Sequence, residues 1–218
     1  MRLAATVMLV RDGADGLEVL MVRRSSRSAF APDAFVFPGG TVDPQDYATA
    51  PNGWAARIVD EFRAVTPDVL PTTEAPVGEA DAAALVAAAV RELHEEAAVE
   101  IAPERLVLFS HWITPPTEPR RYNTHFFLAP GDEAATASAD AFETHDAQWI
   151  VPALALERYE RGEMHLVYPT IKHLERLAAF ERVADALAFA RSKPIVTIMP
   201  DRAPSEGFVM PAELEGAW

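Results

Sequence analysis

The segment "RELHEEAAV", Arg91 to Val99, places three glutamates and an arginine within six consecutive residues of a predicted helix. On an α-helix, Glu92, Glu95 and Glu96 stand at positions i, i+3 and i+4, so their side chains share one face. Carboxylates at this spacing repel one another, and near the C-terminal end of a helix they also oppose its macrodipole. Helix stability alone would favour lysine here, so the segment indicates another role.

A divalent cation would reverse this electrostatic argument. Mg²⁺ and Mn²⁺ prefer hard oxygen ligands, which carboxylates, water and substrate phosphates supply together. Arg91 can pair with a neighbouring carboxylate and fix its orientation. Taken alone, the segment favours a solvated acidic face, but "FVFPGG", Phe35 to Gly40, ends a predicted strand where the backbone can approach a ligand closely.

The composition excludes several classes of protein and site. The chain has 218 residues, half of them hydrophobic, which is enough to bury a substantial core. Its net charge of −14 disfavours nucleic acid and anionic membranes as partners. The chain has no cysteine, which excludes disulfides, thiolate metal sites and a cysteine nucleophile. The lack of cysteine fits a cytoplasmic protein. The short apolar stretch Leu3 to Val10 has no small-residue cleavage pattern after it, so we expect a strand rather than a signal peptide, and no apolar stretch is long enough for a membrane span.

The order of periodic segments predicts a mixed fold. The turn "DGADG" joins the first two predicted strands as a hairpin, and an alanine-rich helix carries apolar residues at helical spacing. Hairpin-linked strands interrupted by helices are typical of the α+β class. We expect strands at 3–10, 17–23, 105–113, 121–129 and 147–151, and helices at 54–65, 79–98 and 169–192.

We interpret the chain as one domain spanning residues 1–218. Residues 41–79 are punctuated by five prolines, which indicates an insertion or lid rather than a separate domain. A dimer contact or a plain spacer would explain this segment equally well. Residues 200–218 are predicted to form an irregular tail.

Together, "FPGG" and "RELHEEAAV" resemble the signature of the Nudix hydrolase family. Gly40 corresponds to the opening glycine of that signature. The resemblance covers most of the chain and implies an α/β/α sandwich with a mixed sheet and an insertion inside the Nudix box. The residues that match the second half of the signature are Arg91, Glu92, Leu93, Glu95, Glu96 and Val99.

Two departures from this signature stand out. The family's arginine follows the glycine by fourteen residues, whereas Arg91 follows Gly40 by 51 (91 − 40), so 37 residues are extra. Counting back eight residues from Arg91 reaches Ala83, where the family has its first glutamate. Three acidic residues are possible replacements: Asp46, Glu79 and Asp81.

The resemblance implies a metal-dependent hydrolase that cleaves a nucleoside diphosphate linked to another moiety. Glu92, Glu95 and Glu96, with the backbone carbonyl of Gly39, would then bind Mg²⁺ or Mn²⁺. Arg91 would position Glu92. The general base would be Glu92 itself or an acid before Trp149, either Glu143 or Asp146.

The split box and the arginine-serine loop "RRSSRSAF" resemble the coenzyme A diphosphatase subgroup, which includes the mammalian peroxisomal enzyme and bacterial relatives. The expected substrate is therefore coenzyme A or acyl-coenzyme A, with ADP-ribose or NADH as alternatives. A catalytically inactive Nudix-fold module that binds a nucleotide or regulates is the alternative of another class. The expected partner is a small nucleotide, and a homodimer remains open. The substrate-binding candidates are Arg24, Arg27, Gly40 and Arg121.

Overall fold

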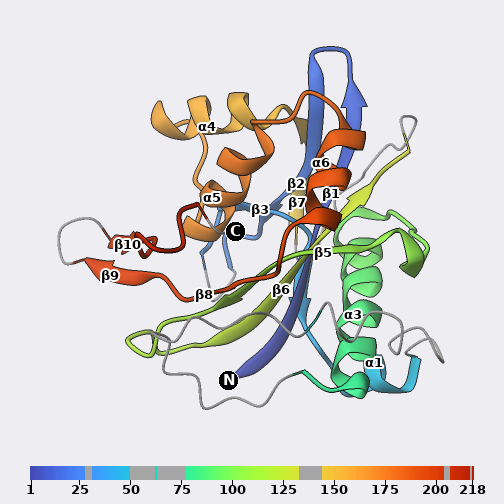
Figure 1. The fold of residues 1–218 in the computed structure, drawn as a ribbon. Helices are drawn as coiled ribbons and strands as arrows, with labels where there is room; N and C mark the ends of the chain where they lie inside the picture. Colours follow the sequence, from blue (N-terminus) through green and yellow to red (C-terminus); the bar gives the residue numbers. More distant parts are fainter. Residues whose placement is uncertain (28–30, 50–61, 63–76, 133–143, 204–206, 217) are drawn as a thin grey trace.

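The computed structural model describes residues 1–27, 31–49, 62, 77–132, 144–203, 207–216 and 218. A sheet of eight strands lies between helix α3 on one face and helices α5 and α6 on the other (Figure 1). Its strands are β1 (Arg2–Gly13), β2 (Gly16–Arg24), β3 (Phe35–Val36), β4 (Gly39–Thr41), β5 (Val107–Ile113), β6 (Tyr122–Pro130), β7 (Thr144–Ile150) and β8 (Thr197–Ile198).

The helices surround this sheet, and a separate hairpin lies near the C-terminus. The helices are α1 (Pro44–Thr49), α3 (Glu79–Ala97), α4 (Pro152–Glu160), α5 (Tyr168–Leu177) and α6 (Val183–Ser192), with a 3₁₀ turn, η1 (Pro103–Arg105). The hairpin consists of β9 (Asp201–Ala203) and β10 (Gly207–Val209). These elements confirm the predicted α+β sandwich.

The sheet is mixed, and the long strand β1 organises it. The strand order is β3-β2-β1-β6-β5-β8, with β4 also pairing β1 and β7 pairing β2. The far half of β1 pairs antiparallel with β2, whereas its first half pairs antiparallel with β4. Along its other edge β1 runs parallel to β6. The Gly-Gly turn is therefore held against the beginning of β1.

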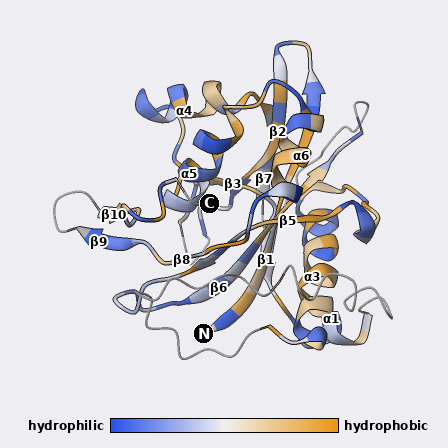
Figure 2. Ribbon diagram, in the orientation of Figure 1, coloured by the Kyte–Doolittle hydropathy of each residue, from blue (hydrophilic) through white to orange (hydrophobic). Residues whose placement is uncertain are grey.

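Both faces of β1 are buried because helices cover both sides of the sheet. Side chains alternate along a strand, so Val7 and Leu9 pack with α3, whereas Met8 and Val10 pack with α5 and α6. In Figure 2 the central strands carry mostly hydrophobic residues. A strand buried on both faces explains why this segment is almost continuously apolar.

Helix α3 packs closely on the sheet because its buried face is built from alanines, including the fully buried Ala84 and Ala88. It ends at Ala98, whose φ of 54° is left-handed and whose N–H donates to the carbonyl of His94. This position usually favours glycine. The acidic end of α3 is thereby fixed beside β4.

The predicted helix over 169–192 is wrong, because the structure has two helices there, α5 and α6. The interruption contains neither glycine nor proline. Instead, the Oδ1 atom of Asp12, in the β1–β2 hairpin, accepts the N–H of Val183 at 2.9 Å and caps the start of α6. This long-range cap is a tertiary contact that helical periodicity does not encode.

The predicted irregular tail is also wrong in part. The β9–β10 hairpin forms within it, and Met210, Leu214 and Trp218 are buried in the core. The ring of Trp218 packs edge-on against Trp112, with 5.5 Å between their centroids. The tail therefore completes one face of the molecule.

The segment 41–79 is described only in part. Its first residues belong to β4 and α1, and Phe62 is buried at 2% exposure. Residues 50–61 and 63–76 lie outside the described residues, so the predicted helix at 54–65 and the lid interpretation stay predictions. Within the described ranges, no helix combines the length and apolarity that a membrane span needs.

His125 on β6 is fully buried, and neither of its ring nitrogens has a hydrogen-bond partner among the residues that the structure describes. Its ring stacks on His111, with 4.4 Å between centroids, and lies near Phe62. Burial, with a smaller contribution from His111, lowers the pKa of His125 well below its usual value. The imidazole is therefore neutral, at a cost of about 1–3 kcal/mol for its unpaired polar atoms.

Replacing His125 with phenylalanine should weaken the dependence of stability on pH. Unfolded histidine binds a proton below about pH 6.5 and folded His125 does not, so acid favours unfolding by about 1.4 kcal/mol per pH unit. Between pH 7 and 5, urea titrations should show His125→Phe losing about 2 kcal/mol less than the wild type. His165→Phe, at an exposed position, is the control for the substitution itself. Parallel stability curves for wild type and His125→Phe would contradict this account.

Candidate active site

The Gly-Gly turn lets β4 fit between β1 and the last turns of α3. A Cβ atom on Gly39 would lie 2.5 Å from the carbonyl oxygen of Ala5, and one on Gly40 would overlap the Glu92 carboxylate. The N–H of Gly39 donates to Oε2 of Glu96 at 2.9 Å. Both glycines are needed because backbone and carboxylates approach one another here without room for side chains.

Arg91 is the centre of a network of charged groups beside this turn. Its Nε and Nη2 atoms bind the two carboxylate oxygens of Asp46, each at 2.9 Å, and Nη2 also donates to the carbonyl of Thr41 at 3.1 Å. Its Nη1 atom donates to Glu92 and to Glu95, each at 2.8 Å. One guanidinium thus fixes α1, β4 and the acidic face of α3 relative to one another.

Asp46 is the acid that pairs with Arg91 from outside α3. It lies six residues after Gly40, is 1% exposed, and accepts the N–H of Asp43 at 2.7 Å in a capping arrangement at the start of α1. The other two candidates for the missing first acid do not reach Arg91: Glu79 is exposed, and Asp81 accepts the hydroxyl of Tyr47. Of the three candidates, Asp46 is therefore the one that pairs with Arg91 in the structure.

Several carboxylates gather around Arg91. Four of them, on Asp46, Glu92, Glu95 and Glu96, lie around the single guanidinium of Arg91 and the Gly39 N–H. Hydrogen bonding to Asp46, followed by that to Glu92 and Glu95, raises the pKa of Arg91, which stays charged. The remaining negative charge and hard oxygen donors suit Mg²⁺ or Mn²⁺ in chemical type.

The three glutamates are not arranged as a ready set of ligands. Within the part of the chain that the structure describes, no three His, Cys, Asp or Glu side chains are grouped so that they could hold a metal ion. Arg91 Nη1 binds both Glu92 and Glu95, and Glu96 is turned toward Gly39. Binding one ion through all three glutamates would require these side chains to turn from the arrangement seen here, although Glu92 and Glu95 each contact Arg91 through one carboxylate oxygen only.

A cavity of about 570 Å³ lies over this network. One wall carries Glu92, Glu95 and Glu96, two of which are nearly buried, at 9% for Glu92 and 5% for Glu96. The cavity is also lined by two cations, Arg2 and Arg24. It continues over β6 to the beginning of α5 and is large enough for a nucleotide-sized ligand.

The structure brings some predicted site residues to this cavity and not others. Gly39, Gly40, Arg24, Arg91 and the three box glutamates line it. Arg27 is exposed and does not line it, and Arg121 donates through Nε to the carbonyl of Thr114. Asp146 is exposed on β7 and is not among the lining residues. Glu143 lies outside the described residues.

Sequence reasoning missed Arg2. The pairing of Ala4 with Thr41 brings the first residues of strand β1 to the site. There, Arg2 Nη2 donates a hydrogen bond to Thr41 Oγ1 at 2.9 Å. It also missed Tyr122 and Thr124 of β6 as cavity residues. No local motif marks these positions, because strand pairing alone brings them to the cavity.

Curated proteins similar to this chain include two that are described here, and no protein-family model matches it. Putative nudix hydrolase 7 of Caenorhabditis elegans is 28% identical over 172 residues, covering 73% of this chain and 55% of the relative. Acyl-coenzyme A diphosphatase NUDT19 of Xenopus laevis is 23% identical over 240 residues, covering 79% of this chain and 62% of the relative. The chain thus spans less than two thirds of either relative's length.

One solved structure matches this chain over a larger share of its own length than the two curated relatives do. The crystal structure of a NUDIX hydrolase from Alicyclobacillus acidocaldarius superposes with a TM-score of 0.65 at 28% sequence identity. The match covers 86% of this chain and 96% of that one. Because the match covers nearly the whole of the other protein, the two chains share the complete fold and not only one part of it.

Substituting Asp46 with asparagine should destabilise the fold by about 2–3 kcal/mol, because a buried carboxylate that binds Arg91 through both oxygens loses its charge. Asp81→Asn is a matched control on an exposed carboxylate that also links α1 to α3. Urea denaturation of both variants measures the difference. Equal losses in the two variants would show that Asp46 has no special role.

The glycine turn, the arginine and the acidic helix face lie together in space, although 51 residues (91 − 40) separate Gly40 from Arg91. The mixed sheet between helices and the similarity to nudix proteins agree with this arrangement. The chain therefore has the Nudix fold and is similar in sequence to Nudix hydrolases.

Proposed function

We propose that this chain is a metal-dependent hydrolase of nucleoside diphosphates linked to another moiety, and that its substrate is coenzyme A or an acyl-coenzyme A. The observation that carries the proposal is the Arg91 network at one wall of a cavity that also holds Arg2 and Arg24. Carboxylates can bind a metal ion, and arginines can donate hydrogen bonds to phosphate. A site that has both suits a diphosphate that is bound together with a metal ion.

The acidic wall would supply the metal ligands. Glu92, Glu95 and Glu96, with the carbonyl of Gly39, would hold Mg²⁺ or Mn²⁺. When bound, such an ion neutralises phosphate charge and lowers the pKa of water. Arg91 restrains Glu92 through its 2.8 Å hydrogen bond, and Asp46 in turn restrains Arg91. Glu92 is the candidate general base among the described residues, and Glu143 is the candidate outside them.

The two cavity arginines would bind the anionic substrate. In a chain of net charge −14, diphosphate binding needs local positive charge. Arg2 donates to Thr41 beside the Gly-Gly turn, Arg24 ends β2, and both residues line one cavity. Arginine suits phosphate because its planar donors bind two oxygens at once.

The arginine-serine loop and the similarity to an acyl-coenzyme A diphosphatase favour coenzyme A compounds. ADP-ribose and NADH are the alternatives within the same reaction class, and both lack a 3′-phosphate. A nucleotide-binding module without catalysis is the alternative of another class. The lack of a ready group of three metal ligands among the described residues favours that alternative.

Glu96→Gln should abolish most hydrolysis without harming the fold. The amide oxygen can still accept the Gly39 N–H, whereas the charge for the metal is lost. We expect kcat/KM for coenzyme A with limiting Mg²⁺ to fall on the order of 100-fold or more, with thermal stability in EDTA unchanged or slightly raised. Glu100→Gln, at an exposed site beyond the helix, is the control. Wild-type turnover by Glu96→Gln would refute the metal assignment, and coenzyme A binding without any hydrolysis by the wild type would favour the binding module.

Arg24→Gln should impair coenzyme A hydrolysis more than dephospho-coenzyme A hydrolysis if Arg24 binds the 3′-phosphate. Loss of a charge-assisted contact of this kind lowers kcat/KM on the order of tenfold to a hundredfold. Arg27→Gln provides a control from the same loop, because Arg27 does not line the cavity. Equal losses on both substrates would assign Arg24 to the diphosphate instead. Hydrolysis of ADP-ribose or NADH but not of coenzyme A would overturn the substrate.

A further inference from the structure

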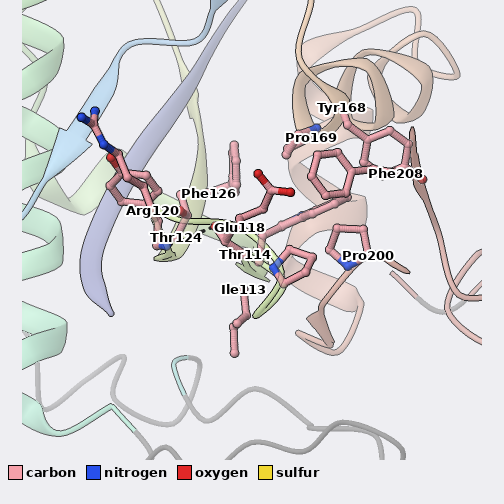
Figure 3. A pocket seen from close by; sticks show the side chains of 13 residues that line it. Ile113, Thr114, Glu118, Arg120, Thr124, Phe126, Tyr168, Pro169, Pro200 and Phe208 are labelled. Carbon is pink, nitrogen blue, oxygen red and sulfur yellow. Dashed lines mark hydrogen bonds between the residues drawn. The ribbon is translucent and has the colours of Figure 1, made fainter. Parts of the chain in front are cut away.

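A second pocket of about 120 Å³ opens beside the carboxylate cavity. The two share five lining residues, so they adjoin each other. In Figure 3, Tyr168, Pro169 and Phe208 lie on one side of the smaller pocket, and Pro200 lies near them. The shared residues are Thr114, Tyr122, Thr124, Phe126 and Pro169.

The lining of this pocket is dominated by aromatic rings and prolines. Trp112 and Phe126 come from β5 and β6, Tyr168 comes from the start of α5, and Phe208 comes from β10. The rings of Tyr168 and Phe208 pack together with 6.0 Å between centroids. Such a surface gains free energy mainly by removing apolar ligand groups from water.

The charged residues at this pocket do not suit a charged ligand. Glu118 forms an ion pair with Arg202 of β9, and the Arg202 guanidinium lies 5.6 Å from the centre of the Phe208 ring. Arg120 extends away from Tyr168 and Phe208 in Figure 3. The Glu118–Arg202 pair therefore holds the hairpin over the pocket, and an uncharged group is the ligand that fits.

The sheet register gives the span between the two sites. Thr41 pairs with Ala4, Ala4 with Thr124, and Thr124 with Trp112, forming one row across β4, β1, β6 and β5. With neighbouring strands about 4.8 Å apart, Trp112 lies about 14 Å from the Gly-Gly turn. A nucleobase is joined to its phosphate through a single ribose, whereas an extended arm beyond the second phosphate can cover this span.

We propose that this apolar pocket binds the aliphatic end of the substrate, an uncharged acyl chain at the far end of the arm attached to the diphosphate. The proposal rests on the proposed function, because it assumes that the diphosphate occupies the carboxylate cavity. It assigns selectivity for acylated over free coenzyme A to the wall formed by Phe208 and Tyr168. The volume of the pocket suits a short acyl chain.

Binding and hydrolysis of S-hexanoyl-coenzyme A and free coenzyme A test this proposal separately. Calorimetric titration in EDTA measures binding without turnover. Each methylene that enters the pocket should tighten binding about fourfold, so the hexanoyl ester should bind on the order of tenfold or more tightly than free coenzyme A. In Mg²⁺ or Mn²⁺, kcat/KM should show a preference in the same direction.

Variants of Phe208 test whether the preference for the hexanoyl ester arises in this pocket. Phe208→Ala should reduce the hexanoyl preference to about one, whereas Phe208→Leu, which keeps an apolar wall, should retain most of it. Phe180→Ala removes a half-buried phenylalanine that does not line the pocket and should keep the wild-type preference. Circular dichroism and thermal melting of each variant identify any loss that arises from unfolding.

The outcomes separate the two proposals. Equal binding of both compounds by the wild type, or a preference that survives in folded Phe208→Ala, would overturn the acyl pocket even if coenzyme A is hydrolysed. Tighter binding of the hexanoyl ester that depends on Phe208, without hydrolysis of either compound, would support the pocket and refute the proposed catalytic function.

Discussion

The two-oxygen pairing of Asp46 with Arg91 is the interaction on which the rest of the site depends. It joins residues 45 positions apart and anchors α1 against α3. With Asp46 holding two of its donor atoms, Arg91 can bind Glu92 and Glu95 only through Nη1. The orientation of the acidic helix face therefore follows from one buried ion pair, which Asp43 supports through a backbone hydrogen bond.

A second constraint is the space between β4 and its neighbours. Gly39 and Gly40 have no side chains, and the alanine face of α3 lets the helix lie close to the sheet. Together they bring a backbone N–H within 2.9 Å of Glu96. These short approaches concentrate carboxylate charge at one end of a cavity whose lining also includes Arg2 and Arg24. The arrangement suits an anionic ligand accompanied by a cation better than either alone.

Much of the fold follows from local sequence pattern. The β1–β2 hairpin, α3 and the later strands carry clear periodicity, and the structure confirms them within a few residues. The interruption between α5 and α6 was missed because its cause, the Asp12 cap on Val183, joins residues 171 positions apart. The order within the tail was missed for a similar reason, since its aromatic and apolar side chains find their partners only in the folded core.

The sequence likewise predicted part of the candidate site and missed part of it. Its motif residues were recognisable because the chemistry needs glycines, arginine and glutamates in fixed relation. Spacing alone left Asp46, Glu79 and Asp81 as equal replacements for the first acid, and the ion pair with Arg91 distinguishes them. Arg2 was invisible to motif reasoning because it reaches the cavity through the pairing of β1 with β4. Glu143 and residues 50–61 and 63–76 keep the standing of sequence predictions.

The central claim is that the acidic face of α3 is a divalent-metal site whose geometry Arg91 controls. Anomalous diffraction from crystals soaked with Mn²⁺ tests it most directly. The account predicts an anomalous peak at coordination distance, about 2.0–2.3 Å, from carboxylate oxygens of Glu92, Glu95 or Glu96, with Arg91 still bound to Asp46. An ordered acidic face without a peak, in crystals that bind Mn²⁺ elsewhere, would contradict it.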